Sequence, residues 1–128
     1  MEISENARPA HPYAMGRTYS LGRNKQHQYV YRRGKSYPGK QLVLVYLRAK
    51  ELKAAFSVST KVGNAVVRNR IRRYMREDFR MLLPSLKSGK YIFIARNHAG
   101  GAPHEALTKD MHSILRRAEL LGERGATS

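Results

Sequence analysis

The side chains with the clearest capacity for chemistry in this sequence are cations gathered in one short segment. Residues 61–80 contain seven lysines and arginines and only two acidic residues, Glu77 and Asp78. At about 100° per residue on a helix, the apolar and basic side chains of this segment separate onto two adjoining arcs. The apolar arc holds Val67, Ile71, Tyr74, Met75, Phe79 and Leu82, with Asp78 as a misfit near its end. The basic arc holds Arg68, Asn69, Arg72, Arg73, Arg76 and Arg80.

This basic arc is typical of a surface that binds a polyanion. Solvated helix faces usually mix charge signs through Glu–Lys pairs four residues apart, whereas Arg68, Arg72 and Arg76 repeat one sign at that spacing. Gly63-Asn64 precedes the periodic pattern, and Asn is a preferred helix N-cap. Unpaired N–H groups at a helix start suit a phosphate. The segment therefore predicts a helix that packs one face on a core and offers the other to an anion.

The composition of the whole chain supports this interpretation. A net charge of +16 on 128 residues exceeds what solubility needs and favours nucleic acid as the partner, with strongly salt-dependent binding. An anionic membrane surface is a weaker alternative, because the chain has no tryptophan and the apolar arc is core-like. No stretch is apolar enough to span a bilayer. The absence of cysteine excludes disulfides and thiolate metal sites, and it fits a cytoplasmic location.

Residues suited to catalysis do not form a recognisable constellation. Glu77 and Asp78 are adjacent on the predicted helix, so their side chains point about 100° apart. The five histidines lack metal-ligand spacing, and the carboxylates of the last helix, Asp110 among them, are expected to be solvated. Nine acidic residues among twenty-five cations do not suggest a two-metal nuclease site. We expect no catalytic residue and no bound metal in this protein, so any hydrolysis would belong to a partner.

The pattern of elements predicts one α/β domain. Residues 1–20 are expected to be a flexible extension without the apolar core of a signal peptide, 21–121 the domain, and 122–128 a flexible tail. The predicted order is helix, strand, strand, helix, strand, helix, which makes a small mixed sheet covered by helices. The first predicted helix is capped by Asn24, runs to about Arg33 and is stopped by a left-handed Gly34. The other predicted helices are 65–83 and one that begins near Pro103. The predicted strands are 41–48, 54–59 and 91–95, with a turn at 36–39 and a connection of hairpin length at 49–53.

The segment FSVSTKVGNAVVRNRIRRYMREDFR (56–80) closely resembles the signature of the bacterial ribonuclease P protein subunit. Its most specific part is Arg68-Asn69-Arg70 after Gly63-Asn64-Ala65-Val66. The likeness extends over residues 21–121, in order and at compatible spacing. The further matches are Leu21 with Asn24, Val30-Tyr31, Gly34, the Leu42–Leu47 strand and Tyr91–Arg96.

The resemblance implies a partnership with a catalytic RNA. In that family the RNA subunit hydrolyses precursor tRNA with the help of Mg²⁺ and releases the mature 5′ end. The protein binds this RNA through the arginine-rich helix, and it holds the single-stranded 5′ leader in a cleft between the first helix and the sheet. The family fold is a two-layer α/β sandwich with a left-handed strand–helix–strand crossover. General sheet geometry favours a right-handed one, and here we follow the family. The protein alone is expected to be monomeric.

The resemblance also assigns site residues, position by position. The residues expected to contact RNA are Lys61, Asn64, Arg68, Asn69, Arg70, Arg72, Arg73 and Arg76. The residues expected in the leader cleft are His27, Tyr31, Val45 and Phe56. His27 stands where many members have Phe, Val45 where some have Tyr, and Thr60 where a second Lys is common. For Phe56, ordinary core packing is an equally good interpretation.

Two other functions share the charge of this chain. An RNA-binding module without a processing role, such as a ribosomal protein, would have the same charge and fold class. A DNA-binding protein would place the arginine helix in the major groove, but the sequence shows no clear base-reading side chains and no dimer interface.

Overall fold

A computed structural model of the chain describes residues 20–21 and 24–122. The extension expected at 1–20 and the tail expected at 122–128 therefore lie outside the described residues, except for Ser20 and Gly122. The helices are α3 (Asn24–Arg33), α4 (Ala65–Leu82) and α5 (His104–Arg117), with short 3₁₀ turns η1 (Leu83–Ser85) and η2 (Asn97–Gly101). The strands are β1 (Lys35–Pro38), β2 (Leu42–Leu47), β3 (Leu52–Ser57) and β4 (Gly89–Ala95).

The four strands form one mixed sheet in the order β1-β2-β4-β3. β4 pairs antiparallel with β2 and parallel with β3, so it lies between two strands that are consecutive in the sequence. Residues 49–53 consequently do not close a hairpin, although their length suggested one. The turn predicted at 36–39 was also wrong in part, because Ser36, Tyr37 and Pro38 pair with β2 as an edge strand. An edge position tolerates Pro38, whose nitrogen has no hydrogen to donate.

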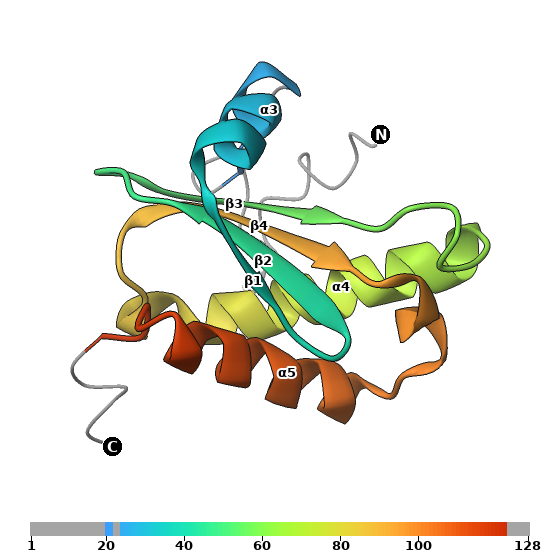
Figure 1. Ribbon diagram of the computed structural model, residues 1–128. Coiled ribbons are helices and arrows are strands. Elements are labelled where there is room, and N and C mark those ends of the chain that lie inside the picture. Colours follow the sequence, from blue (N-terminus) through green and yellow to red (C-terminus); the bar gives the residue numbers. More distant parts are fainter. Residues whose placement is uncertain (1–19, 22–23, 123–128) are drawn as a thin grey trace, which may run out of the picture.

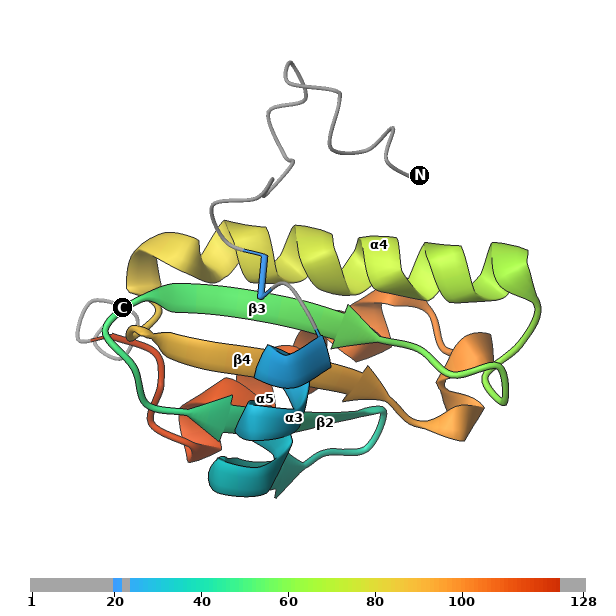
Figure 2. The same cartoon turned by 90° about the horizontal axis from the view of Figure 1, so that it is seen from above.

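The crossover from β3 through α4 to β4 is left-handed. α4 lies beneath the sheet in Figure 1. Figure 2 shows the sheet from the face that α4 does not cover, and there β3 and β4 point in the same direction. Viewed from the side that α4 covers, with both strands pointing up, β4 lies to the left of β3. Right-handed crossovers are the rule for such units, so the family resemblance predicted this feature correctly where general sheet geometry did not.

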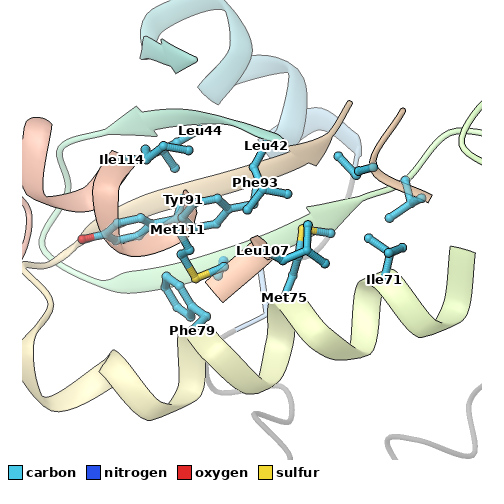
Figure 3. Close-up of a cluster of buried hydrophobic side chains, with 14 of the residues drawn as sticks. Leu42, Leu44, Ile71, Met75, Phe79, Tyr91, Phe93, Leu107, Met111 and Ile114 are labelled. Carbon is cyan, nitrogen blue, oxygen red and sulfur yellow. The ribbon is translucent and has the colours of Figure 1, made fainter. Parts of the chain in front are cut away.

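The main core lies between the sheet and the two helices α4 and α5. The alternate strand residues Leu42 and Leu44, together with Tyr91 and Phe93, point to this side and are fully buried. Figure 3 shows them meeting side chains from both helices. The helix residues in this cluster include Ile71, Met75, Phe79, Leu107, Met111 and Ile114. Val67, Tyr74 and Leu82 pack against its margin, so the apolar arc predicted for α4 is confirmed. Burial also raises the pKa of the Tyr91 hydroxyl, which donates to Lys87 O at 2.6 Å.

The opposite face of the sheet carries α3, which lies across the strands (Figure 2). Val30 of α3 is fully buried against Val45 and Ile92, and Leu21 completes this second cluster. α3 begins at Asn24, the predicted cap, and ends at Arg33, as predicted. The left-handed conformation expected at Gly34 was wrong, because among the described residues the only glycine with positive φ is Gly89, at 145°. At Gly34 a Cβ would lie 2.6 Å from Val30 O and 2.8 Å from Tyr46 O, so close packing of the backbone excludes a side chain there.

Two buried carboxylates tie the helices to the rest of the fold. Asp110 of α5 is 8% exposed and accepts backbone hydrogen bonds from Lys40, Gln41 and Leu42 at 3.0, 2.8 and 2.9 Å. The expectation that Asp110 is solvated was therefore wrong. Its carboxylate binds the turn between β1 and β2, because those N–H groups have no strand partner there. The misfit Asp78 of α4 has a similar role toward α5.

Asp78 joins the two helices that cover the main core. It accepts hydrogen bonds from His104 Nε2 and Thr108 Oγ1, both at 3.0 Å. Burial raises the pKa of the Asp78 carboxyl, and these two contacts with α5 oppose that rise. The ring of His104 also stacks on Tyr74, with centroids 4.2 Å apart. The acidic interruption of the apolar arc is thus a polar contact between helices.

Candidate nucleic-acid interface

The start of α4 is fixed by its own polar groups. Asn64 has an extended backbone, and its side-chain oxygen accepts from Val67 N at 3.0 Å, which caps the helix as predicted. The helix carries no acidic residue in its first turn, so the positive end of its dipole is not neutralised there. Lys61 lies in the preceding loop with an exposed side chain. This end of α4 therefore presents backbone and side-chain positive charge together.

Two arginines of the predicted motif are held by backbone carbonyls. Arg68 Nε donates to Gly63 O at 3.1 Å, and Arg70 Nη2 donates to Gly100 O at 3.3 Å. Both side chains are half-buried. A guanidinium has five N–H donors, so each arginine keeps several of them for another acceptor. Because the carbonyls are neutral, these bonds orient the guanidinium groups without cancelling their charge.

The next turns of α4 carry further basic residues. Arg72 Nη1 donates to Asn69 Oδ1 at 2.8 Å, and Arg73 lies 5.6 Å over the ring of Tyr74. Asn69 and Arg73 are exposed, whereas Arg72 and Arg76 are half-buried. All eight residues predicted to contact RNA therefore lie on α4 or in the loop that leads into it. Their contacts with RNA stay a prediction.

The residues predicted for the leader cleft lie on one flank of α3 and on the sheet. Tyr31 is 44% exposed, and His27, one turn earlier, is half-buried. Residues four apart lie on the same side of a helix, so these two rings form one edge, which we call the Tyr31 flank. Val45 lies on the same sheet face but is only 7% exposed and packs in the cluster of Val30. Val45 thus contributes more to holding α3 than to an open surface.

Phe56 does not belong to this cleft, and its assignment there was wrong. It points to the other face of the sheet, where its ring is stacked on Phe93 at 6.3 Å and meets the edge of Phe79 at 5.7 Å. The strand alternation that puts Leu44 and Phe93 in the main core puts Phe56 there too. The alternative interpretation of Phe56 as a core residue is therefore the correct one.

A second group of side chains on α3 was not singled out from the sequence. Arg33 lies 5.8 Å and Lys90 5.9 Å from the ring centroid of Tyr29. The spacing of Tyr29 and Arg33, four residues apart, is visible in the sequence. Lys90 comes from the start of β4, and only the tertiary fold brings it to α3. We call these three residues the Tyr29 flank.

The part of the chain that the structure describes shows neither a metal cluster nor a membrane span. Within residues 20–21 and 24–122, no three or more His, Asp or Glu side chains are placed to hold a metal ion. No helix in the same range is long and apolar enough to cross a bilayer.

Comparison with known proteins identifies the family. The family model for ribonuclease P matches residues 15–119. The chain belongs to the ribonuclease P protein family. A ribonuclease P protein component from an Exiguobacterium species is 35% identical over 113 residues, which cover 87% of this chain and 99% of that protein. The one from Staphylococcus carnosus is 36% identical over 113 residues, covering 86% and 98%.

Solved structures of ribonuclease P proteins have the same fold. The Staphylococcus aureus protein superposes with a TM-score of 0.77 at 29% identity, covering 81% of this chain and 98% of that one. The Thermotoga maritima protein gives a TM-score of 0.70 at 20% identity, covering 77% and 96%, and it supports the fold alone. The predicted family and fold class are therefore confirmed.

Proposed function

We propose that this chain is the protein component of a bacterial ribonuclease P holoenzyme in the cytoplasm. In this proposal it binds the catalytic RNA through α4 and the unpaired 5′ leader of precursor tRNA through the Tyr31 flank. The RNA then carries out the cleavage that matures the tRNA 5′ end. The observation that supports it best is the set of basic side chains on α4, of which Arg68 and Arg70 are oriented by the carbonyls of Gly63 and Gly100.

The geometry of α4 suits a folded RNA more than a flexible anion. Arginines that are already oriented lose less side-chain entropy when they bind a phosphate. Several such groups at fixed positions recognise the spacing of phosphates along an RNA backbone. Contacts with phosphates do not depend on the base sequence. Each phosphate that is neutralised adds about 0.7–0.9 to the slope of log affinity against log salt. The expected interaction is therefore strong, dependent on RNA shape and sensitive to salt.

The leader contact relies on stacking. Tyr31 leaves nearly half of its surface open, and a base stacked on an aromatic ring contributes about 1–3 kcal/mol whatever its identity. His27 offers a second, smaller ring. This contact explains how one protein could assist the processing of many precursor tRNAs that differ in leader sequence.

We assign the Mg²⁺ required by this reaction class to the RNA partner, as the family resemblance implies. Besides stacking on the leader, the protein contributes electrostatically. Its cations lower the repulsion between the catalytic RNA and the precursor, so the holoenzyme should need less Mg²⁺ than the RNA alone.

The decisive experiment uses the full chain reconstituted with its own catalytic RNA and a precursor tRNA. The double variant Arg68→Ala/Arg70→Ala should weaken RNA binding and lower the slope of its salt dependence by about 1.4–1.8. Arg68→Lys/Arg70→Lys keeps the charge but loses the guanidinium geometry, so it should recover the slope and only part of the affinity. Lys109→Ala/Arg116→Ala removes the same charge from the exposed face of α5 and should behave like the wild type.

Two outcomes would refute parts of the proposal. A salt slope that is equal in the α4 and α5 double variants would exclude α4 as the RNA-binding surface. Tight RNA binding without faster precursor cleavage at low Mg²⁺ would favour the RNA-binding module without a processing role.

A further inference from the structure

The side of α3 that faces away from the Tyr31 flank also carries an exposed tyrosine, with two cations near its ring. On a helix at 100° per residue, positions 29 and 33 lie about 160° around the axis from positions 27 and 31. Val30 lies between the two pairs and points into the sheet, where it is fully buried. α3 therefore separates two surfaces on the same face of the sheet, and each has an exposed tyrosine.

The Tyr29 flank collects positive charge around a neutral ring. Arg33 and Lys90 both lie within 5.9 Å of the Tyr29 ring centroid, so two like charges share one aromatic partner. Among residues 20–21 and 24–122, the structure places no carboxylate within ion-pair distance of either cation. Glu51, the acidic residue of the adjoining loop, is exposed and binds Gly89 N only through its backbone oxygen. The repulsion between the cations is therefore not relieved within the described fold.

We propose that the Tyr29 flank is a second site for unpaired RNA, occupied by leader nucleotides that lie further 5′ than those on the Tyr31 flank. This inference rests on the proposed function. Tyr29 is 43% exposed, which leaves part of the ring open to a base, while Arg33 and Lys90 are placed to bind the flanking phosphates. Aromatic rings combined with cations are the usual means of holding single-stranded nucleic acid without reading its sequence.

The width of α3 sets the leader length at which this site becomes occupied. A helix with its side chains is about 10–12 Å across, and a stacked strand advances about 3.4 Å per nucleotide. A leader must therefore extend roughly four nucleotides beyond the Tyr31 flank before it reaches Tyr29. Short leaders should not use the Tyr29 flank, whereas long leaders should.

The test compares precursor tRNAs with a short leader and with one about six nucleotides longer, using the reconstituted holoenzyme. Arg33→Ala/Lys90→Ala should weaken binding of the long-leader precursor about five- to tenfold, reduce its salt slope by about 1.4 and leave the short-leader precursor unchanged. Tyr29→Ala should weaken the long-leader precursor in the same selective way, and Tyr29→Phe should restore binding. Tyr31→Ala should weaken both precursors.

The controls separate this site from a general charge effect and from the proposed function. Lys109→Ala/Arg116→Ala removes the same charge elsewhere and should affect neither precursor. Equal losses for both leader lengths, or no loss for the long one, would overturn the Tyr29 site while the effects at Tyr31 and α4 stand. Binding of a single-stranded oligouridylate to the full-length protein without RNA subunit gives an independent measure. Unchanged affinity in Arg33→Ala/Lys90→Ala would also refute the site, even if the holoenzyme failed to assemble.

Discussion

Replacing Asp110 by alanine should be among the most damaging single substitutions in the fold, although the residue is not one of those predicted to contact RNA. Its carboxylate accepts three backbone N–H groups, from Lys40, Gln41 and Leu42, over a separation of about seventy residues. Alanine would leave the buried N–H of Leu42 without a partner and would release the turn that starts β2. It would also remove the hydrogen bonds by which Asp110 joins α5 to that turn.

The size of the effect follows from these three bonds. A hydrogen bond to a charged acceptor contributes about 1.5–3 kcal/mol. Water can replace the carboxylate at the exposed Lys40 and partly at Gln41, so the losses do not add fully. We expect Asp110→Ala to lower the free energy of unfolding by about 3–5 kcal/mol, a large share of the roughly 5–15 kcal/mol typical of a domain. Asp110→Asn keeps one acceptor oxygen and should cost about 2–3 kcal/mol.

Urea denaturation followed by far-ultraviolet circular dichroism measures this directly. With a slope of about 1–3 kcal/mol per molar urea, the midpoint for Asp110→Ala should fall by about 1–5 M. Glu105→Ala is the matched control, because its carboxylate is 76% exposed and pairs only with the equally exposed Lys109 at 3.4 Å. An Asp110→Ala protein that unfolds within about 0.5 kcal/mol of the wild type would show that the three hydrogen bonds do not stabilise the turn.

Three further substitutions test other features of the fold. Gly89→Ala should lower the free energy of unfolding by about 3 kcal/mol or more, because φ is 145° and a Cβ would collide with the Tyr46 ring; thermal denaturation would measure it. Phe56→Leu should lower the free energy of unfolding by about 1–2 kcal/mol through lost contact with Phe93, and it should leave leader affinity unchanged. A selective loss of leader binding would show that Phe56 does belong to the leader cleft. Asp78→Asn should change the pH profile of stability. Burial raises the pKa of Asp78, so the folded state binds this proton more tightly than the unfolded chain does. The wild type therefore loses stability as the pH rises from about 3.8 toward the raised folded value, and the Asn variant lacks that loss. Denaturation from about pH 3 to pH 6 would show identical profiles if Asp78 did not titrate there.

The sequence predicted best what depends on local pattern. The periodic apolar residues of α4 and the capping side chain of Asn64 located that helix to within one residue at each end. α3 was located equally well. The strand β3 was predicted at 54–59, two residues later than observed. Leu52 and Lys53 follow a polar run in the sequence, and only their pairing with β4 makes them part of the strand.

Features set by distant residues could not be predicted in this way. Lys35–Pro38 has the composition of a turn, and it becomes a strand because β2 pairs with it and Asp110 holds the turn that follows. The contact between Lys90 and Tyr29 joins residues that are sixty-one positions apart in the chain. The left-handed crossover came from the family resemblance alone, since general sheet geometry favours the other hand.

The place of β4 in the sheet has a consequence for how the molecule is assembled. Among the described strands, β4 is the last to be synthesised, yet it lies between β2 and β3. One edge of β2 and one edge of β3 therefore stay unpaired until Gly89–Ala95 has left the ribosome. Pairing between strands that are distant in the sequence is slow, because the chain loses the entropy of the intervening loop before the stabilising contacts form. During that interval α4 has no complete sheet to pack on. The proposed binding of RNA by α4 is therefore expected to begin abruptly in a nascent chain, when β4 inserts, rather than gradually as the arginines emerge.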